Sequence, residues 1–158
     1  MVTEWHLHHL PVRFEGHDRP WTVVRHVVVD WPQWKVEGFI LRTSPLRVLF
    51  VGRDGVRVTV TGLEVRGRDA VVRRTRRWRR ERMLASGNWR GMPVFAADGR
   101  LLGRLQDLVI DAETMTIARL VVSRGLLGDL MQGALQVPVL RVSEDNGRIK
   151  IRRDGQTG

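Results

Sequence analysis

The sequence predicts an all-β protein in which short strands form small barrels or a sandwich. Apolar and polar residues alternate in Val56–Val60 and in Arg148–Ile151, which is the period of a strand with one buried face. Asp54-Gly55, Asp98-Gly99 and Asn146-Gly147 are dipeptides that favour tight hairpin turns. Short strands with such frequent turns are typical of barrels and sandwiches rather than of a parallel α/β fold.

The order of turns and strands repeats along the chain. Pro11 precedes the first turn of one half and Pro93 that of the other, and a later apolar strand ends in Asp30 or in Asp111. The matched segments are 27–30 with 108–111, 34–41 with 115–122, 58–60 with 135–137, and the closing hairpins that end at 71–72 and 149–151. We interpret this order as a tandem duplication of a unit of about 70 residues. The predicted repeats span residues 7–73 and 91–152.

The segment between the predicted repeats, residues 74–90, is strongly basic. From Arg73 to Arg82, seven of the ten residues are arginine and one is acidic. Thr75 is a suitable N-cap and Gly87 a suitable helix stop, so we expect a short linker helix. At 100° per residue the arginines surround this helix, which is typical of a solvated connector. The alternative is a surface that binds an acidic partner, either RNA or protein.

The composition indicates a basic globular protein. The chain has 158 residues, 27 basic and 17 acidic side chains, a formal net charge of +10 and 42% hydrophobic residues, which is too apolar for a disordered chain. Only Lys35 and Lys150 of the basic residues are lysine. The lack of cysteine excludes disulfides, thiolate zinc sites and cysteine nucleophiles. No apolar run approaches the roughly 20 residues of a membrane helix, and the first residues lack the pattern of a secretory signal, so we expect a cytoplasmic protein.

Four residues are candidates for structural turns and bends. Asp30 and Asp111 end strands and open turns, where a carboxylate accepts neighbouring backbone N–H groups. The alternative, an acid–base pair, is disfavoured because equivalent positions of two repeats would lie in different barrels. Gly99 suits a left-handed turn position, and Gly103 within a strand pattern indicates a bulge or a tight bend.

No pattern in the sequence predicts catalysis. The serines lie in no nucleophile-elbow pattern, and no glycine-rich loop with a lysine predicts phosphate binding. His6 and His8 would share one face of a partly exposed first strand, but a catalytic zinc needs three protein ligands and a structural zinc four. We therefore expect no enzymatic activity, no cofactor, no metal and no small-molecule substrate.

Three groups of residues are candidates for partner binding. Trp31 and Trp34 form an aromatic turn that either covers a barrel end or anchors a protein or a base. Leu126 and Leu127 lie in a loop between two expected strands, where they belong either to the core or to an interface. The third group consists of the linker arginines Arg76, Arg77, Arg79 and Arg80.

Glycine and aspartate positions in the second half form a pattern of moderate specificity. The Asp98-Gly99 turn is followed by Leu102-Gly103, then by Asp107 and an apolar strand that ends at Asp111. Over residues 90–152 this pattern resembles the PRC-barrel domain.

The first half departs from that pattern and is matched only through the second. Trp21-Thr22 stands in place of Leu102-Gly103, and His26 stands in place of Asp107. With both halves included, the expected architecture is two PRC-type barrels joined by the basic linker helix.

The resemblance implies a small, strongly bent β-barrel used for docking rather than for catalysis. Similar domains occur in photosynthetic reaction centres and in a ribosome maturation factor. We therefore expect a non-catalytic adaptor that docks onto a protein assembly. The alternative is an RNA- or ribosome-associated factor that uses the basic linker.

Overall fold

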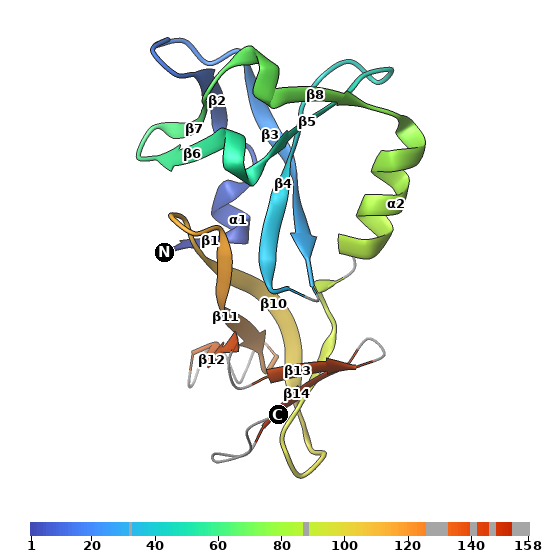
Figure 1. Ribbon diagram of the computed structural model, residues 1–158. Coiled ribbons are helices and arrows are strands. Elements are labelled where there is room, and N and C mark those ends of the chain that lie inside the picture. Colours follow the sequence, from blue (N-terminus) through green and yellow to red (C-terminus); the bar gives the residue numbers. More distant parts are fainter. Residues whose placement is uncertain (32, 87–88, 126–132, 140–141, 146–147, 153–158) are drawn as a thin grey trace. The chain divides into compact units, whose positions relative to one another are not determined.

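The computed structural model (Figure 1) describes residues 1–158 except 32, 87–88, 126–132, 140–141, 146–147 and 153–158. The protein is mostly β, as the sequence predicts. It divides into two compact units, Met1–Gly87 with Ile110–Thr116, and Asn88–Val109 with Ile117–Gly158. Residues 110–116 belong to the second repeat predicted from the sequence, yet they group with the first unit.

The chain consists mainly of short strands, with short helices between some of them. Up to residue 87 they are β1 (Val2–Thr3), α1 (Glu4–Leu7), β2 (Pro11–Phe14), β3 (Thr22–Asp30), β4 (Lys35–Leu41), β5 (Val48–Gly52), η1 (Arg53–Gly55), β6 (Val56–Thr59), β7 (Gly62–Val65), η2 (Arg68–Ala70), β8 (Val71–Arg74) and α2 (Arg76–Ser86). After it they are β9 (Pro93–Phe95), β10 (Leu101–Asp111), β11 (Thr116–Ser123), β12 (Leu135–Pro138), β13 (Val142–Asp145) and β14 (Arg148–Ile151).

In the first unit β3 and β4 form the central hairpin. β3 pairs antiparallel with β2 and β4, β4 pairs with β5, and β5 pairs with β8. β2 also pairs parallel with β7, which forms a hairpin with β6. The valine run of β3 and the apolar end of β4 are buried, so these strands supply the core.

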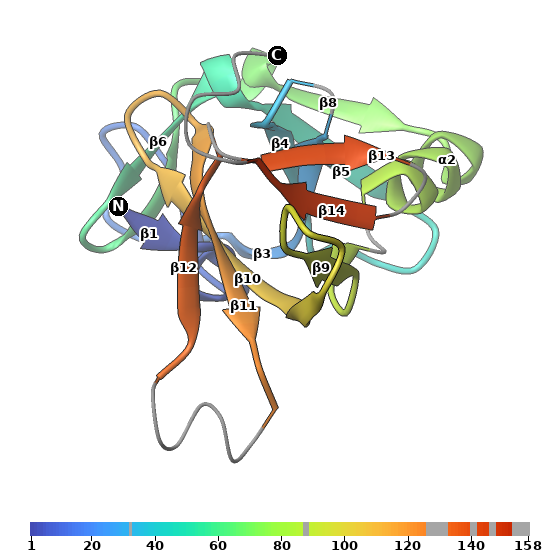
Figure 2. The ribbon, with the colours of Figure 1, turned by 90° about the horizontal axis from the view of Figure 1, so that it is seen from below.

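In the second unit β9 lies between β10 and β14. It pairs antiparallel with β10 and parallel with β14, and β14 forms a hairpin with β13 (Figure 2). β11 pairs antiparallel with β12. Ile149 in β14 is buried while Arg148 and Lys150 on either side are exposed, which is the alternation expected for a half-buried strand.

The prediction of a strand that contains His6 and His8 is wrong. Residues Glu4–Leu7 form a single helical turn, and the Thr3 Oγ1 atom accepts a hydrogen bond from the His6 N–H at 3.2 Å. The Glu4 carboxylate is buried and contacts the His8 ring, one helical turn further on. The helix forms because a capping threonine precedes it and because Leu7 is buried in the core.

Candidate functional site

The basic segment forms the α2 helix, which begins directly after a capping threonine. The Thr75 Oγ1 atom accepts a hydrogen bond from the Trp78 N–H at 3.1 Å, and the Thr75 carbonyl accepts one from the Arg79 N–H at 3.1 Å. The first bond satisfies a donor that the first helical turn would otherwise leave unpaired, and the second is the first bond of the helix itself. The Gly87 stop predicted from the sequence lies outside the described residues.

One face of α2 packs against the sheet of the first unit. Trp78 and Met83 contact a cluster formed by Val28, Ile40, Val48 and Phe50. The rings of Trp78 and Phe50 meet edge to face with their centroids 4.9 Å apart, a favoured aromatic geometry. At the end of the helix the Ser86 Oγ atom is buried and accepts a hydrogen bond from the Val29 N–H at 2.8 Å.

The prediction of a solvated connector is therefore wrong for α2. The helix is part of the first unit, because an aromatic residue, a methionine and a buried serine fix it to β3, β4 and β5. Sequence periodicity finds only a narrow stripe without arginine around Trp78. That stripe is enough to pack α2 against the sheet, because arginines with long aliphatic stems can lie beside a buried contact while their charges stay in water.

Packing sorts the arginines of α2 into two sets. Arg79 and Arg82 lie on the packed side of the helix, and the Arg82 Nη1 atom lies 3.4 Å from the Glu37 carboxylate of β4. The Arg82 guanidinium also lies over the Trp78 ring at 6.0 Å. Arg79 is half-buried and contributes positive charge near His26.

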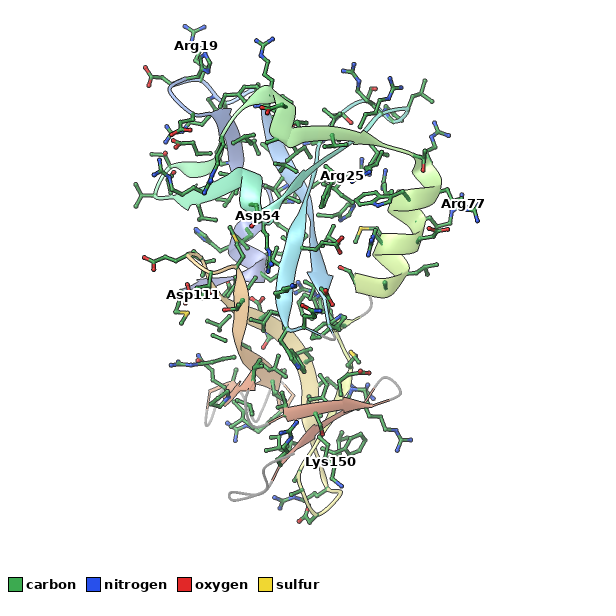
Figure 3. All side chains as sticks on the ribbon, viewed as in Figure 1. Arg19, Arg25, Asp54, Arg77, Asp111 and Lys150 are labelled. Atoms are coloured by element: carbon green, nitrogen blue, oxygen red, sulfur yellow. The ribbon has the colours of Figure 1, made fainter. Side chains whose placement is uncertain are left out.

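The second set faces the solvent. Arg76, Arg77 and Arg80 are exposed, and at 100° per residue they fall within one face that also contains Leu84. Leu84 is 69% exposed. Arg77 contacts Glu81 at 3.1 Å, and Arg80 has no hydrogen bond or ion pair to another described residue. Figure 3 shows Arg77 extending away from the helix, so we name Arg76, Arg77, Arg80 and Leu84 the outward face of α2.

His26 of β3 lies in a strongly basic environment. The pKa of its imidazole is lowered from 6.5 to about 4, mainly by burial and then by the positive charges of Arg25 and Arg79. His8 adds to this effect, and Glu4 opposes it. His26 is therefore neutral at pH 7.

The predicted aromatic turn joins β3 to β4. The rings of Trp31 and Trp34 are T-shaped with centroids 5.4 Å apart, and both residues are half-buried. Trp34 adopts a left-handed φ of 51° and its N–H donates to the Trp31 carbonyl at 3.2 Å. The other apolar candidates, Leu126 and Leu127, lie outside the described residues.

The turn residues occupy distinct local environments. The Asp111 Oδ1 atom accepts hydrogen bonds from the Glu113 N–H at 2.9 Å and the Thr114 N–H at 3.3 Å. Asp30 ends β3 and pairs with Lys35 in the ladder. Gly99 has a left-handed φ of 90°, and Gly103 lies at a register shift between β9 and β10.

Gly103 sits where the backbone comes close to a neighbouring strand. A Cβ atom at this position would collide with the Ser123 carbonyl. Only glycine fits such an approach without a backbone shift.

The described residues contain no cluster of three or more histidine, aspartate or glutamate side chains that could hold a metal ion. In the same part of the chain no helix has the length and apolar character needed to cross a membrane. The structure thus brings together the arginines of α2 but assembles no metal centre from the residues it describes.

The comparisons with known proteins agree with the sequence pattern of the second half. The family model of the PRC-barrel domain matches residues 81–156. This match begins within α2 and continues through β14. No curated protein matches the chain. One PRC-barrel domain is therefore found in this chain, over residues 81–156.

Proposed function

We propose that this chain is a non-catalytic docking protein that binds an acidic protein partner through the outward face of α2. The supporting observation is that three arginines and an exposed leucine share one face of a helix whose other face is packed in the core. A helix that is already folded and fixed needs little further ordering when a partner binds it. PRC-barrel domains commonly mediate protein interactions, which is consistent with this proposal.

The chemistry of the outward face defines the partner. Guanidinium groups pair with carboxylates as well as with phosphates, and Leu84 offers an apolar contact among them that suits a protein side chain. Glu81 beside Arg77 partly neutralises one end of the face. We therefore expect a protein segment that combines carboxylates with one apolar side chain.

RNA is the alternative partner, and the position of Trp78 argues against it. Binding to single-stranded nucleic acid commonly combines basic side chains with exposed rings on which bases stack. In α2 the Trp78 ring packs against Phe50 on the sheet side, so the outward face presents no aromatic ring. Three arginines alone would make only a weak and salt-sensitive contact with phosphates.

The second part of the proposal is that the chain contains two copies of one PRC-type unit. The supporting observation is that the same pairs of strands are made twice, in the same register. In the first half β2 pairs antiparallel with β3 and parallel with β7. In the second half β9 pairs antiparallel with β10 and parallel with β14.

Individual residues follow the same correspondence. Val12 pairs with Thr22 and Leu63, and Val94 pairs with Gly103 and Ile149. Further along, the β4–β5 pairs match the β11–β12 pairs, which places residues 135–137 opposite β11 as residues 49–51 lie opposite β4. This register replaces the sequence match of residues 135–137 with residues 58–60. β8 and α2 then follow the first copy as an addition.

The docking proposal can be tested with two defined probes. One is a synthetic peptide of alternating glutamate and leucine, and the other is a poly-uridine single strand of twelve nucleotides. Binding of each is measured by fluorescence anisotropy as a function of salt. The test variant carries Arg76→Gln, Arg77→Gln and Arg80→Gln, and the matched control carries Arg19→Gln, Arg42→Gln and Arg100→Gln, which remove the same charge from exposed positions elsewhere.

We expect the peptide to bind wild type and control alike and to bind the test variant about tenfold more weakly. Leu84→Ser should weaken peptide binding without changing binding of the poly-uridine strand. Preferential binding of poly-uridine, with a slope of log K against log salt of about −2 for three contacts, would support the RNA alternative instead. If the test variant and the control bind the peptide equally, the outward face of α2 is not the docking surface.

A further inference from the structure

A hollow with a volume of about 640 Å³ lies in the first unit beside β6. Its lining residues are Arg53, Asp54, Val56, Arg57, Val58, Arg66, Ala112, Glu113, Thr114 and Met115. Three of the ten are arginines, which come from η1, from β6 and from the residue just after β7. We name this feature the arginine hollow. It is distinct from the outward face of α2, since the two share no residue.

The three arginines of the hollow differ in how well their charges are compensated. Arg57 lies opposite Glu64 in the β6–β7 ladder and bonds to its carboxylate at 2.5 Å. Among the residues that the structure describes, Arg53 reaches only Asp54, at 3.9 Å, and that carboxylate is 99% exposed. Arg66 has no side-chain hydrogen bond or ion pair to another described residue. Two guanidinium groups at the hollow are thus weakly compensated or free.

Apolar side chains form another part of the lining. Val56 and Met115 are buried and Val58 is half-buried. Beside the arginines they give the hollow a cationic part and an apolar part. A ligand that fits both must carry a negative charge and an apolar group.

The hairpin tip that contributes residues 112–115 is held by its own hydrogen bonds. Asp111 accepts bonds from the Glu113 and Thr114 N–H groups, and the Met115 carbonyl accepts one from the Val36 N–H at 2.8 Å. The wall of the hollow is therefore formed without a ligand. A preformed wall lowers the ordering cost of binding.

We propose that the arginine hollow binds a compact organic anion in which a carboxylate or phosphate is attached to an apolar group. Arg53 and Arg66 supply donors in the planar fork that matches both anions, and the valines and Met115 take the apolar part. The carboxylates of Asp54 and Glu113 also line the hollow and repel additional negative charge. The site therefore favours one compact anionic group over an extended polyanion such as a nucleic acid.

The test is a titration of the full chain followed through its backbone amide resonances. The probes are phenyl phosphate and benzoate, with inorganic phosphate as an anion without an apolar part and benzyl alcohol as an apolar group without charge. The test variant is Arg53→Gln with Arg66→Gln. The control is Arg19→Gln with Arg42→Gln, which removes the same charge away from the hollow.

We expect phenyl phosphate or benzoate to shift the resonances of residues 53–58, 66 and 112–115 to saturation. The test variant should bind at least fivefold more weakly, while the control and the α2 triple variant should bind as wild type does. Arg66→Lys, which keeps the charge and loses the fork, should give an intermediate affinity and serves if the double variant does not fold.

Either of two results would overturn this proposal. One is equal affinity of the wild type and the arginine variants for both aromatic probes, including an absence of saturation at about 20 mM probe in all of them. The other is that inorganic phosphate or benzyl alcohol binds as tightly as the aromatic anions do. Such a result would show that the hollow does not require both a negative charge and an apolar group in its ligand. A failed α2 experiment leaves the hollow unaffected, because the variants concern separate residues.

Discussion

The strands of residues 11–65 and those of residues 93–151 pair in the same scheme, yet the two regions differ in where the backbones come close. Val12 pairs with Thr22 in the first region, and Val94 pairs with Gly103 in the second. The Thr22 hydroxyl donates to the Arg42 carbonyl at 2.5 Å. At Gly103 even a Cβ atom would collide with the Ser123 carbonyl. One strand register therefore tolerates two strand separations, and the local separation decides whether glycine is required.

A second difference lies beyond the last hairpin of the first region. That region continues into β8 and α2, whose packing depends on Phe50. The Phe50 ring in turn lies where a Cβ atom at Gly38 would collide with it. In the first region, the close backbone approach at Gly38 of β4 leaves room for the Phe50 ring, against which α2 packs. In the second region, the close approach at Gly103 of β10 involves only the neighbouring strand. The added helix carries the charge proposed to bind a partner.

The largest effect is expected at Gly103. We expect Gly103→Thr to destabilise the second unit by about 3 kcal/mol or more, because the side chain forces the strands apart. The reciprocal change, Thr22→Gly, should cost only about 1 kcal/mol for the lost hydroxyl bond and the added chain entropy. Denaturant unfolding followed by residue-resolved amide signals gives both values. Equal costs at the two sites would contradict the difference in strand separation.

The packing of α2 is tested by Trp78→Ala. Removing a half-buried ring that contacts the cluster of Val28, Ile40, Val48 and Phe50 should destabilise the first unit by about 2–3 kcal/mol. Hydrogen exchange of residues 76–86 should rise more than that of β9 and β10. An unchanged stability would mean that α2 is held by other contacts. Leu84→Ala on the outward face is the control and should change stability by less than about 0.5 kcal/mol.

Acid should act on the first unit through His26. The unfolded chain binds a proton with a pKa of 6.5, whereas the pKa in the folded state is lowered to about 4, mainly by burial and then by Arg25 and Arg79. The contribution is fully present above pH 6.5 and is lost as the pH falls toward 4, because the unfolded state takes up the proton first.

For this partly solvated group we expect a loss of about 1–2 kcal/mol between pH 7 and pH 4.5. Denaturant unfolding at a series of pH values checks this loss. His26→Gln should make the first unit less dependent on pH in this window. If the wild type and the variant keep the same pH profile, His26 is not the responsible group.

The smallest effects are expected at the two strand-end aspartates. Asp111→Asn should cost about 1 kcal/mol, because a carboxylate accepts the Glu113 and Thr114 N–H groups more strongly than an amide does. Asp30→Asn should cost less than about 0.5 kcal/mol, since its side chain makes no hydrogen bond to another described residue. Thermal unfolding of the two single variants measures the difference. A larger cost at Asp30 would reverse the expected order.

Local patterns in the sequence predict much of the fold. Alternating residues indicate the β6 and β14 strands, and the Asp98-Gly99 dipeptide indicates the turn between β9 and β10. The hairpin turn predicted at Asp54-Gly55 is wrong, because these residues form the η1 helix between two strands that do not pair. Thr75 indicates where α2 begins, because capping depends on the threonine and the three residues after it. Such features depend on neighbours along the chain, so a single sequence contains the information needed to predict them.

The faces of the helix and the arginine hollow depend on contacts between distant residues. The burial of Trp78 requires Phe50 and Val28, and the meeting of Arg53, Arg57 and Arg66 requires the register of β6 and β7. No periodicity within α2 contains that information, because seven arginines in ten residues conceal the short apolar stripe. Local residue patterns therefore predict most of the strands and the start of α2, whereas they miss the helical turn at Glu4–Leu7. Which arginines of α2 are exposed depends on the tertiary structure, because burial depends on which strands come together in space.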